Sequence, residues 1–189
     1  MLIKTKLLTK MGEYREVNGD LLKLASQGIF DIVAHGCNCQ KTMGAGIALQ
    51  IAHRFPQAYE IDRMDDRLPI ERLGDMTISS SILMLNKNNP RPEETVETRE
   101  VRILNLYIQL FPGRNLSRSA LRLCLVKVNM MFSGQSIGLP LIGCGIGGDD
   151  WREVKEIVVE ELKDMNVTIV HYSGDMIKRV PPVFSQRLL

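Results

Sequence analysis

The stretch DIVAHGCNCQKTMGAGIA, residues 31–48, decides the fold that this sequence predicts. Its first part, DIVAHGC (31–37), is an apolar run that ends in small residues, which is typical of a buried strand. Gly44 and Gly46 follow in a polar loop, and apolar positions then recur on one face of a helix expected over 44–55. The stretch therefore predicts a buried strand, a glycine-rich loop and an amphipathic helix in direct succession.

The rest of the chain repeats this alternation of strand and helix. We expect further strands at 14–18, 75–86, 101–109, 136–144 and 167–175, and helices at 117–132 and 151–165. Pro56 either ends the helix at 44–55 or opens another one. Residues 2–9 are expected to pair with 14–18, the polar stretch 87–100 to form a surface loop, and the tail 176–189 to be irregular. Such alternation predicts one α/β domain over 1–175, with a mostly parallel sheet covered on both faces.

Composition excludes several classes of protein. The 189 residues are 44% hydrophobic and 24% charged with a net charge of +2, which is too balanced to indicate nucleic-acid binding. No apolar run has the length of a membrane span, so we expect no membrane partner. The start MLIKTKLLTK is too short and too rich in lysine for a secretory leader, and the four cysteines form no disulfide framework. We therefore expect a cytoplasmic protein.

The closely spaced pair Cys37 and Cys39 suggests a zinc site, but the pattern is incomplete. The spacing is C-x-C, the nearest histidine is His35, and two further ligands at suitable spacing are missing. We expect packing or loop roles for these cysteines, with no metal and no cofactor.

A second glycine-rich loop, GCGIGGDDW (143–151), also lies between an expected strand and an expected helix. Glycines let backbone N–H groups approach an anion, and a helix N-terminus adds positive potential. Two such loops beyond the carboxyl ends of parallel strands could hold one diphosphate, although each alone could be a tight turn. Neither loop has the Rossmann or P-loop spacing.

Three motifs together carry a resemblance to a known family. NGDLL (18–22), the stretch at 31–48 and PLIGCGIGGDDW (140–151) occur in the order found in macro domains, an ADP-ribose-binding fold. The resemblance covers about residues 14 to 175 and is strongest to the branch of ADP-ribose 1''-phosphate phosphatases and ADP-ribosyl hydrolases. It implies a three-layer α/β/α sandwich around a six-stranded, mixed, mostly parallel sheet.

The resemblance also implies a set of binding residues. Asp20 would bond the adenine amino group, Asn38 would contact the distal ribose, and Tyr172 would lie beside the adenine. The ordinary alternatives are a helix cap, a turn former and sheet packing, respectively. The whole implied ADP-ribose site comprises Gly19, Asp20, Leu21, Gly36, Cys37, Asn38, Met43, Gly44, Ala45, Gly46, Ile47, Gln109, Gly143, Cys144, Gly145, Ile146, Gly147, Gly148 and Tyr172.

Departures from the family pattern bear on the reaction. Relatives that use a catalytic lysine carry it just after the fourth-strand motif, where this chain has NLYIQLFPG (105–113), with Gln109 and no lysine. Gly147 stands where those relatives have an acid. A covalent lysine mechanism is therefore disfavoured.

The candidate catalytic residues are then His35, Asn38, Asp149 and Asp150. We hypothesise that Asn38 orients the distal ribose, His35 handles a proton, and Asp149 or Asp150 positions the attacking water. The alternatives are a satisfied core histidine for His35 and capping of the helix at 151–165 for at least one aspartate.

The expected activity is that of a phosphatase on ADP-ribose 1''-phosphate, with ADP-ribose or a derivative as the ligand. Two alternatives stay open: a hydrolase that removes ADP-ribose from protein or nucleic acid, with such a macromolecule as partner, and a module that binds ADP-ribose without turnover. A general nucleic-acid-binding domain is disfavoured because no basic stripe has interleaved aromatics and only 5% of the residues are aromatic.

Overall fold

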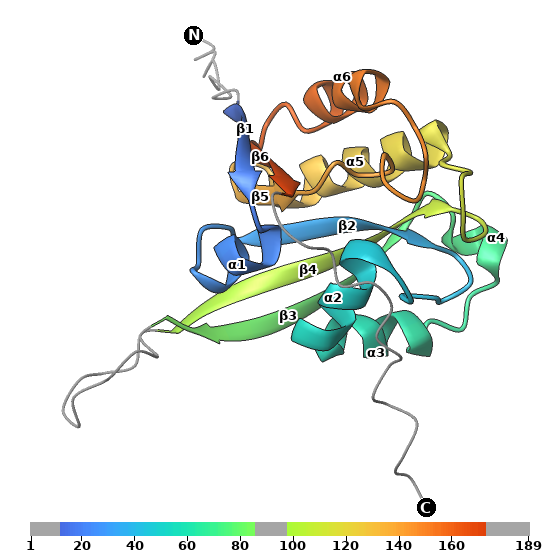
Figure 1. Cartoon of the computed structure of the whole chain (residues 1–189), viewed down its shortest axis with the longest axis horizontal. Helices are drawn as coiled ribbons and strands as arrows, with labels where there is room; N and C mark the ends of the chain where they lie inside the picture. Colours follow the sequence, from blue (N-terminus) through green and yellow to red (C-terminus); the bar gives the residue numbers. More distant parts are fainter. Residues whose placement is uncertain (1–11, 86–97, 173–189) are drawn as a thin grey trace, which may run out of the picture.

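The computed structural model describes residues 12–85 and 98–172, in which strands and helices alternate along the chain (Figure 1). The strands are β1 (Tyr14–Gly19), β2 (Ile32–Asn38), β3 (Met76–Met84), β4 (Thr98–Gln109), β5 (Ser136–Leu139) and β6 (Asn166–Tyr172). The helices are α1 (Leu21–Ser26), α2 (Gly46–Arg54), α3 (Pro56–Met64), α4 (Pro69–Arg72), α5 (Arg118–Phe132) and α6 (Trp151–Glu161).

The six strands form one mixed sheet in the order β1-β6-β5-β2-β4-β3. Every neighbouring pair is parallel except β3 and β4, which run antiparallel at one edge. Because β1, β6, β5, β2 and β4 point the same way, their carboxyl ends meet at a single edge of the sheet. The predicted sheet, mostly parallel and six-stranded, is confirmed.

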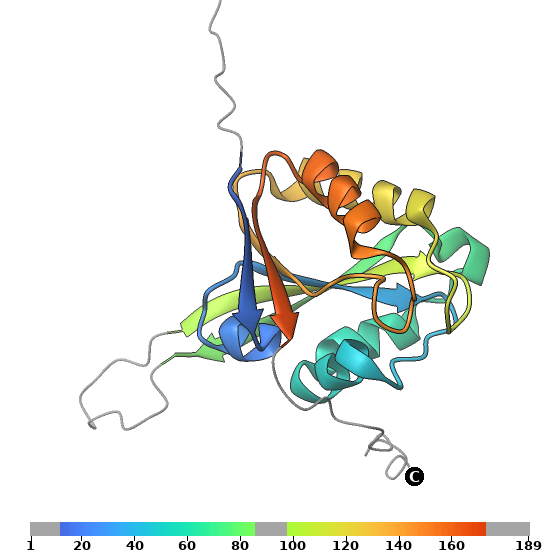
Figure 2. The same cartoon turned by 45° about the horizontal axis from the view of Figure 1, so that its top comes forward.

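Helices cover both faces of the sheet, as expected for a three-layer sandwich. Figures 1 and 2 show α5 and α6 on one face, with α1, α2 and α3 on the other. Successive side chains of a strand point to opposite faces, so β2 contributes Ile32 and Ala34 to the core beneath α5 and α6, and Val33 to the other core. No helix within 12–85 or 98–172 is long and apolar enough to cross a membrane.

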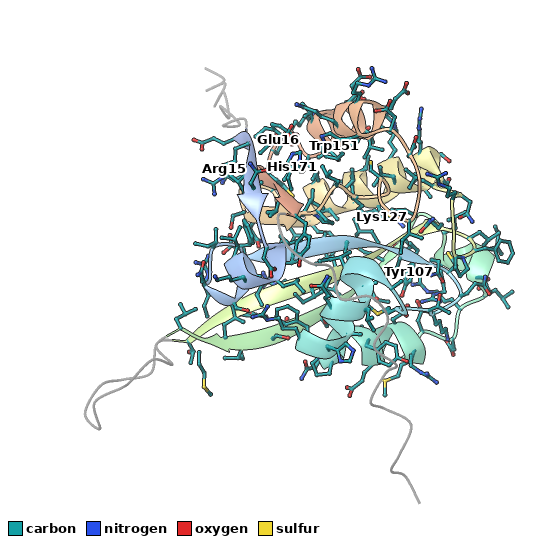
Figure 3. All side chains as sticks on the ribbon, in the orientation of Figure 1. Arg15, Glu16, Tyr107, Lys127, Trp151 and His171 are labelled. Carbon is teal, nitrogen blue, oxygen red and sulfur yellow. The ribbon has the colours of Figure 1, made fainter. Side chains whose placement is uncertain are left out.

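The edge strand β1 is fixed to its neighbours through Glu16, which Figure 3 labels together with His171. Glu16 of β1 lies 2.6 Å from His171 Nε2 of β6 and 2.7 Å from Lys155 Nζ of α6. Hydrogen bonds from Lys155, Tyr14 and His171 lower the pKa of Glu16 to about 2, although slight burial opposes the shift. These contacts hold β1, and therefore the start of α1, against the parallel sheet.

Several boundaries differ from those predicted from sequence. β5 stops at Leu139 rather than 144, because Pro140 has no N–H for the ladder. Residues 98–100 belong to β4 instead of a loop, since β4 continues along the antiparallel β3. α6 ends at Glu161 rather than 165. α2 begins at Gly46, two residues later than expected.

Two short helices, α1 and α4, were not predicted. Each has at most six residues, too few to show the apolar period of a helix. The expected strand at 2–9, the rest of the 87–100 loop apart from 98–100, the last residues of the 167–175 strand and the tail lie outside the described residues.

His35 of β2 belongs to the interior of the protein. Its side chain is fully buried, and its Nε2 lies 2.7 Å from Asn105 Oδ1 on β4. The Asn105 amide nitrogen donates to the carbonyl of Ala58 and the hydroxyl of Thr77. The Asn105 oxygen therefore accepts, so His35 carries a proton on Nε2. The structure favours the alternative of a satisfied core histidine.

Burial lowers the pKa of His35 to about 4 from an ordinary value of 6.5, against the opposing effect of its hydrogen bonds to Asn105 and to the Gly36 backbone. Because only the unfolded state binds a proton between these values, the free energy of unfolding should fall by about 3 kcal/mol as pH drops from 6.5 towards 4. Urea unfolding across this range measures the slope. The dependence of the free energy of unfolding on pH should become weaker in His35→Gln and stay unchanged in the surface control His53→Gln. Equal slopes in all three proteins would contradict the assignment.

Candidate functional site

A cavity of about 530 Å³ opens at the edge where the carboxyl ends of the parallel strands meet. Its lining comes from the ends of β2, β4 and β6, from the starts of α1 and α2, and from the loops that follow β2, β4 and β5. The predicted binding residues that line it are Asp20, Leu21, Gly36, Cys37, Asn38, Gly44, Ala45, Gly46, Ile47, Gln109, Gly143, Cys144, Gly145, Ile146, Gly147 and Tyr172. Gly19, Met43 and Gly148 are not part of the lining.

Strand register explains why residues far apart in sequence meet here. Asn38 at the end of β2 pairs with Gln109 at the end of β4, after a register shift between Cys37 and Asn38. Gly19 at the end of β1 pairs with Tyr172 at the end of β6. The parallel sheet therefore brings the amides of Asn38 and Gln109 to one part of the cavity lining and Tyr172 to another.

The first turn of α2 presents its backbone to the cavity. The N-cap residue, Ala45, has no side-chain hydrogen bond to the helix, and the first turn contains no acidic residue. The first intrahelical bond runs from the N–H of Leu49 to the carbonyl of Ala45, so the N–H groups of Gly46, Ile47 and Ala48 precede it. All three residues line the cavity. Together with the positive end of the helix dipole, they form a site for an anion.

Three other helices are capped at the same position. Asp20 accepts from the first turn of α1, Ser117 from that of α5, and Asp150 from that of α6. The chain thus places a capping side chain on these helices and leaves α2 uncapped where it faces the cavity. α3 also begins without a side-chain cap, at Pro56, but its first turn does not line the cavity, so α2 is set apart by an uncapped first turn whose residues do.

The loop after β5 is a tight turn that depends on glycine. Gly143 has a φ of +75°, in the left-handed region that favours glycine. A Cβ on Gly147 would lie 2.3 Å from the carbonyl oxygen of Gly143, so no other residue fits there without a shift. The tight turn predicted as an alternative is present, and the same turn forms one wall of the cavity.

The two glycine loops lie next to each other at Gly46 and Ile146, and each also borders open space at another glycine. A Cβ on Gly46 would lie 3.5 Å from the side chain of Ile146, which places the β2–α2 loop against the β5 loop. A Cβ on Gly44 or Gly145 would have nothing within 4 Å. Both glycines line the cavity, so the space beside them is available to a ligand.

Asp20 combines two of the predicted possibilities. Its Oδ1 accepts the N–H groups of Leu22 and Lys23, at 2.9 and 3.0 Å, and so caps α1. No hydrogen bond from another described residue reaches Oδ2, while Asp20 lines the cavity. The cap fixes the carboxylate and leaves one oxygen for a ligand.

Asn38 lines the cavity and also shapes the loop that follows it. Its Nδ2 donates to the hydroxyl and the carbonyl of Thr42, at 2.8 and 3.0 Å, and its Oδ1 accepts from the N–H of Gln40. The amide therefore has the turn-forming role that was weighed as an alternative, at a position that still borders the cavity.

The other three candidate catalytic residues do not line the cavity. The core residue His35 lies before the exposed end of β2. Asp149 forms two bonds with Arg118, at 2.7 and 2.6 Å, which lower the pKa of its carboxyl. Asp150 caps α6, and hydrogen bonds from Arg152 lower its pKa to about 2. Each carboxylate thus has a structural partner, and the structure brings none of the three side chains to the cavity.

Among the described residues, neither a reactive thiolate in the cavity nor a cluster of metal ligands is found. Burial raises the pKa of Cys144 to about 11, and that of Cys37 also lies well above its ordinary value, so both thiols are protonated at neutral pH. Within 12–85 and 98–172, no group of three or more His, Cys, Asp or Glu side chains could hold a metal ion.

Some lining residues were not predicted from the sequence. They are Thr42, Ala48, Gln50, Ile108, Pro112, Gly113, Pro140, Leu141, Ile142 and Val170. The signal for Pro112 and Gly113 was available, because they follow the carboxyl end of β4, where ligands of such sheets bind. Gln50 lies one helical turn after Gly46 and could have been found from that spacing.

Known proteins with similar sequences include a phage protein and two enzymes that act on ADP-ribose derivatives. The chain is 31% identical over 160 residues to an uncharacterized 17.5 kDa protein of Enterobacteria phage T4, covering 82% of this chain and 94% of that protein. It is 26% identical to an ADP-ribose 1''-phosphate phosphatase of Saccharomyces cerevisiae, covering 84% of this chain and 98% of the yeast protein. It is also 26% identical to a DNA ADP-ribosyl glycohydrolase of Mycobacterium tuberculosis, but spans only 42% of that enzyme and 83% of itself.

Solved structures with a similar fold include macrodomains. A Bacteroides thetaiotaomicron protein of unknown function matches with a TM-score of 0.63, 21% identity and coverage of 85% of this chain and 98% of that one. The macrodomain of Mycobacterium tuberculosis DarG matches with a TM-score of 0.59, 20% identity and coverage of 84% and 97%. A Trypanosoma brucei macrodomain in complex with ADP-ribose gives 0.55, 14% identity and coverage of 85% and 63%.

No family model matches the chain. The observed sheet order, the cavity between two glycine loops and these relationships nevertheless agree. The chain has the macrodomain fold, and its sequence is similar to those of an ADP-ribose 1''-phosphate phosphatase and a DNA ADP-ribosyl glycohydrolase.

Proposed function

We propose that this protein binds ADP-ribose in the cavity, with the diphosphate between the β2–α2 loop and the β5 loop. One observation carries the proposal: α2 begins without a side-chain cap where its first N–H groups line the cavity. A diphosphate supplies the negative charge and the acceptor oxygens that such a helix start lacks. The cavity volume of about 530 Å³ lies within the usual range of ligand pockets, about 300–1,000 Å³.

The adenine and the distal ribose of the ligand would contact different sets of residues. Asp20 and Tyr172, at the carboxyl ends of β1 and β6, would hold the adenine, with Asp20 Oδ2 accepting from the amino group. Asn38 and Gln109, paired across β2 and β4, would contact the distal ribose. This orientation keeps the diphosphate midway, beside the open glycines Gly44 and Gly145.

We further propose a hydrolase that acts at the distal ribose, first of all on ADP-ribose 1''-phosphate. The similarity to a yeast ADP-ribose 1''-phosphate phosphatase and a mycobacterial DNA ADP-ribosyl glycohydrolase supports hydrolysis at that end of the ligand. The amides of Asn38 and Gln109 would orient the ribose and the attacking water, while N–H groups of the glycine loops would stabilise charge on the phosphates. Removal of ADP-ribose from a macromolecule uses the same end of the cavity.

A binding module without turnover is the second candidate. Among the cavity-lining residues that the structure describes, the only carboxylate is that of Asp20, which the proposal places at the adenine end, and no histidine is present. A hydrolase with this lining would have to act by orientation and charge stabilisation more than by general acid–base catalysis.

Filling the open space should weaken ADP-ribose binding without unfolding the protein. Gly44→Ala and Gly145→Ala each add a methyl group toward the cavity, where no protein atom lies within 4 Å. We expect each to raise the calorimetric Kd at least tenfold, a loss of about 1.4 kcal/mol. The melting temperature without ligand should match that of wild type and of the exposed α5 control Met130→Ala. Wild-type affinity in both glycine variants would place the ligand elsewhere.

Turnover is tested with two substrates side by side. Phosphate release is measured from ADP-ribose 1''-phosphate, and ADP-ribose release from ADP-ribosylated DNA and protein. We expect phosphate release to fall about 100-fold or more in Asn38→Ala, since precise orientation of the reacting groups is worth at least that much. The control Asp149→Asn should keep the wild-type rate, because Asp149 lies outside the cavity.

The outcomes separate the candidates. Release of ADP-ribose alone would favour the macromolecular substrate. Binding of ADP-ribose with no release from any substrate would leave a binding module and refute the hydrolase.

A further inference from the structure

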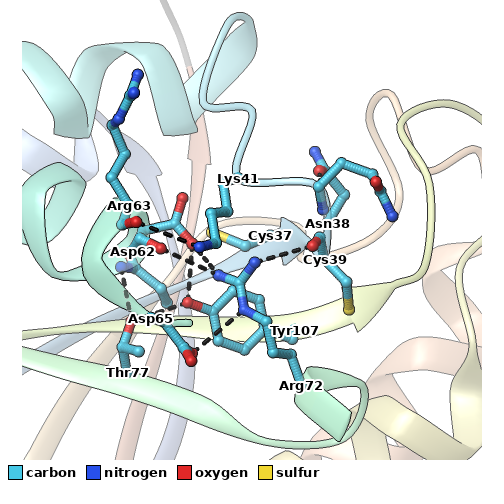
Figure 4. Close-up of polar contacts among 12 residues, drawn as sticks. Cys37, Asn38, Cys39, Lys41, Asp62, Arg63, Asp65, Arg72, Thr77 and Tyr107 are labelled. Carbon is cyan, nitrogen blue, oxygen red and sulfur yellow. Dashed lines mark hydrogen bonds and ion pairs between the residues drawn. The ribbon is translucent and has the colours of Figure 1, made fainter. Parts of the chain in front are cut away.

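In the loop that connects β2 to α2, Cys39 is held through both of its backbone polar groups. Its N–H donates to the carbonyl of Gln109 at the end of β4, at 2.8 Å. Its carbonyl accepts from Nη1 of Arg72, also at 2.8 Å (Figure 4). Both backbone polar groups of the residue that follows Asn38 are therefore fixed, one by the sheet and one by a side chain from α4.

Arg72 is itself rigidly placed. Its side chain is fully buried beside the equally buried Asp62 of α3, to which Nη2 donates, and Nε donates to Asp65 at 3.2 Å. The guanidinium carbon lies 4.1 Å from the centre of the Tyr107 ring on β4. The planar group thus lies on an aromatic ring, with two carboxylates and the Cys39 carbonyl around it.

Stability alone does not explain why Arg72 and Asp62 form a buried ion pair. Removing two charges from water is so unfavourable that well-packed apolar residues of similar size often serve equally well. Asp62 Oδ2 is buried and has no hydrogen-bond partner among the described residues, so the pair is not even fully satisfied. An apolar pair could not supply the polar contacts of Arg72 and Asp62, and among these the bond from Arg72 to Cys39 is the one that reaches the loop after β2.

The loop beyond Cys39 needs such support. Lys41 has a φ of +59°, a left-handed conformation that is unfavourable for a residue other than glycine. Strained backbone of this kind persists where the surroundings hold it, and it is common at ligand sites. Lys41 Nζ reaches the carbonyl of Arg63 in α3, at 3.2 Å, so a second cation holds the same loop to α3.

We propose that Arg72 is a positioning residue for ADP-ribose. By holding Cys39, it keeps the Asn38 amide and the start of α2 in the geometry that receives the distal ribose and the diphosphate before the ligand arrives. Arg72 does not line the cavity and acts only through the loop. The inference rests on the proposed ADP-ribose function for its ligand, but the anchoring of the loop can be measured without any ligand.

The test replaces the buried pair by apolar residues of similar size, in the double variant Arg72→Met with Asp62→Leu. We expect the Kd for ADP-ribose to rise at least tenfold, while the Kd for AMP, which lacks the distal ribose, changes less than threefold. The matched control Asp65→Asn weakens one partner of Arg72 and leaves the bond to Cys39, so its ADP-ribose to AMP affinity ratio should equal that of wild type. A general loss of structure would weaken both ligands together.

Amide hydrogen exchange of the ligand-free proteins provides the independent readout. Exchange at residues 39–45 should accelerate at least tenfold in the double variant and stay unchanged in Asp65→Asn. Should the double variant fail to fold, Arg72→Lys keeps the charge but lacks the planar fork, and the same two effects are expected.

An unchanged affinity ratio together with unchanged exchange would overturn the positioning role. Absence of ADP-ribose binding by wild type would instead refute the proposed function, and the exchange experiment would still decide whether Arg72 anchors the loop.

Discussion

The account depends on one constraint: the first N–H groups of α2 have no side-chain cap and face an open cavity. Backbone donors in this position need an acceptor, and three other helices of the chain receive one from Asp20, Ser117 or Asp150. The parallel sheet places this helix start at the edge where five strands end. The rest of the site follows from that placement, because the loops after the neighbouring strands form its other walls.

Glycines in the two loops have different physical tasks. Gly143 and Gly147 allow the chain to turn tightly after β5, one through a positive φ and one through a close backbone contact. Gly44 and Gly145 instead leave space, since a side chain there would point into the cavity. The loop after β2 contains glycines but still has a defined conformation, because the buried guanidinium of Arg72 bonds the carbonyl of Cys39.

Much of this could be predicted from the sequence because it depends on local order along the chain. Apolar strands followed by glycines and an amphipathic helix predicted the mostly parallel sheet and the two loops, and the resemblance to macro domains implied most of the cavity lining. Side-chain direction could not be predicted in the same way. His35 lies in a strand that leads to the cavity, yet its ring is held by Asn105, and Asp150 adjoins a cavity loop but caps α6. Arg72 gave no sequence signal, because its partners come from α3, β4 and the β2 loop.

The most direct test of the central claim is a crystal structure of this protein with ADP-ribose bound. The account predicts diphosphate oxygens within hydrogen-bond distance of the N–H groups of Gly46, Ile47 or Ala48, with the adenine beside Asp20 and the distal ribose beside Asn38. A ligand whose diphosphate lies away from the start of α2, or whose adenine lies at the Asn38 end, would contradict it.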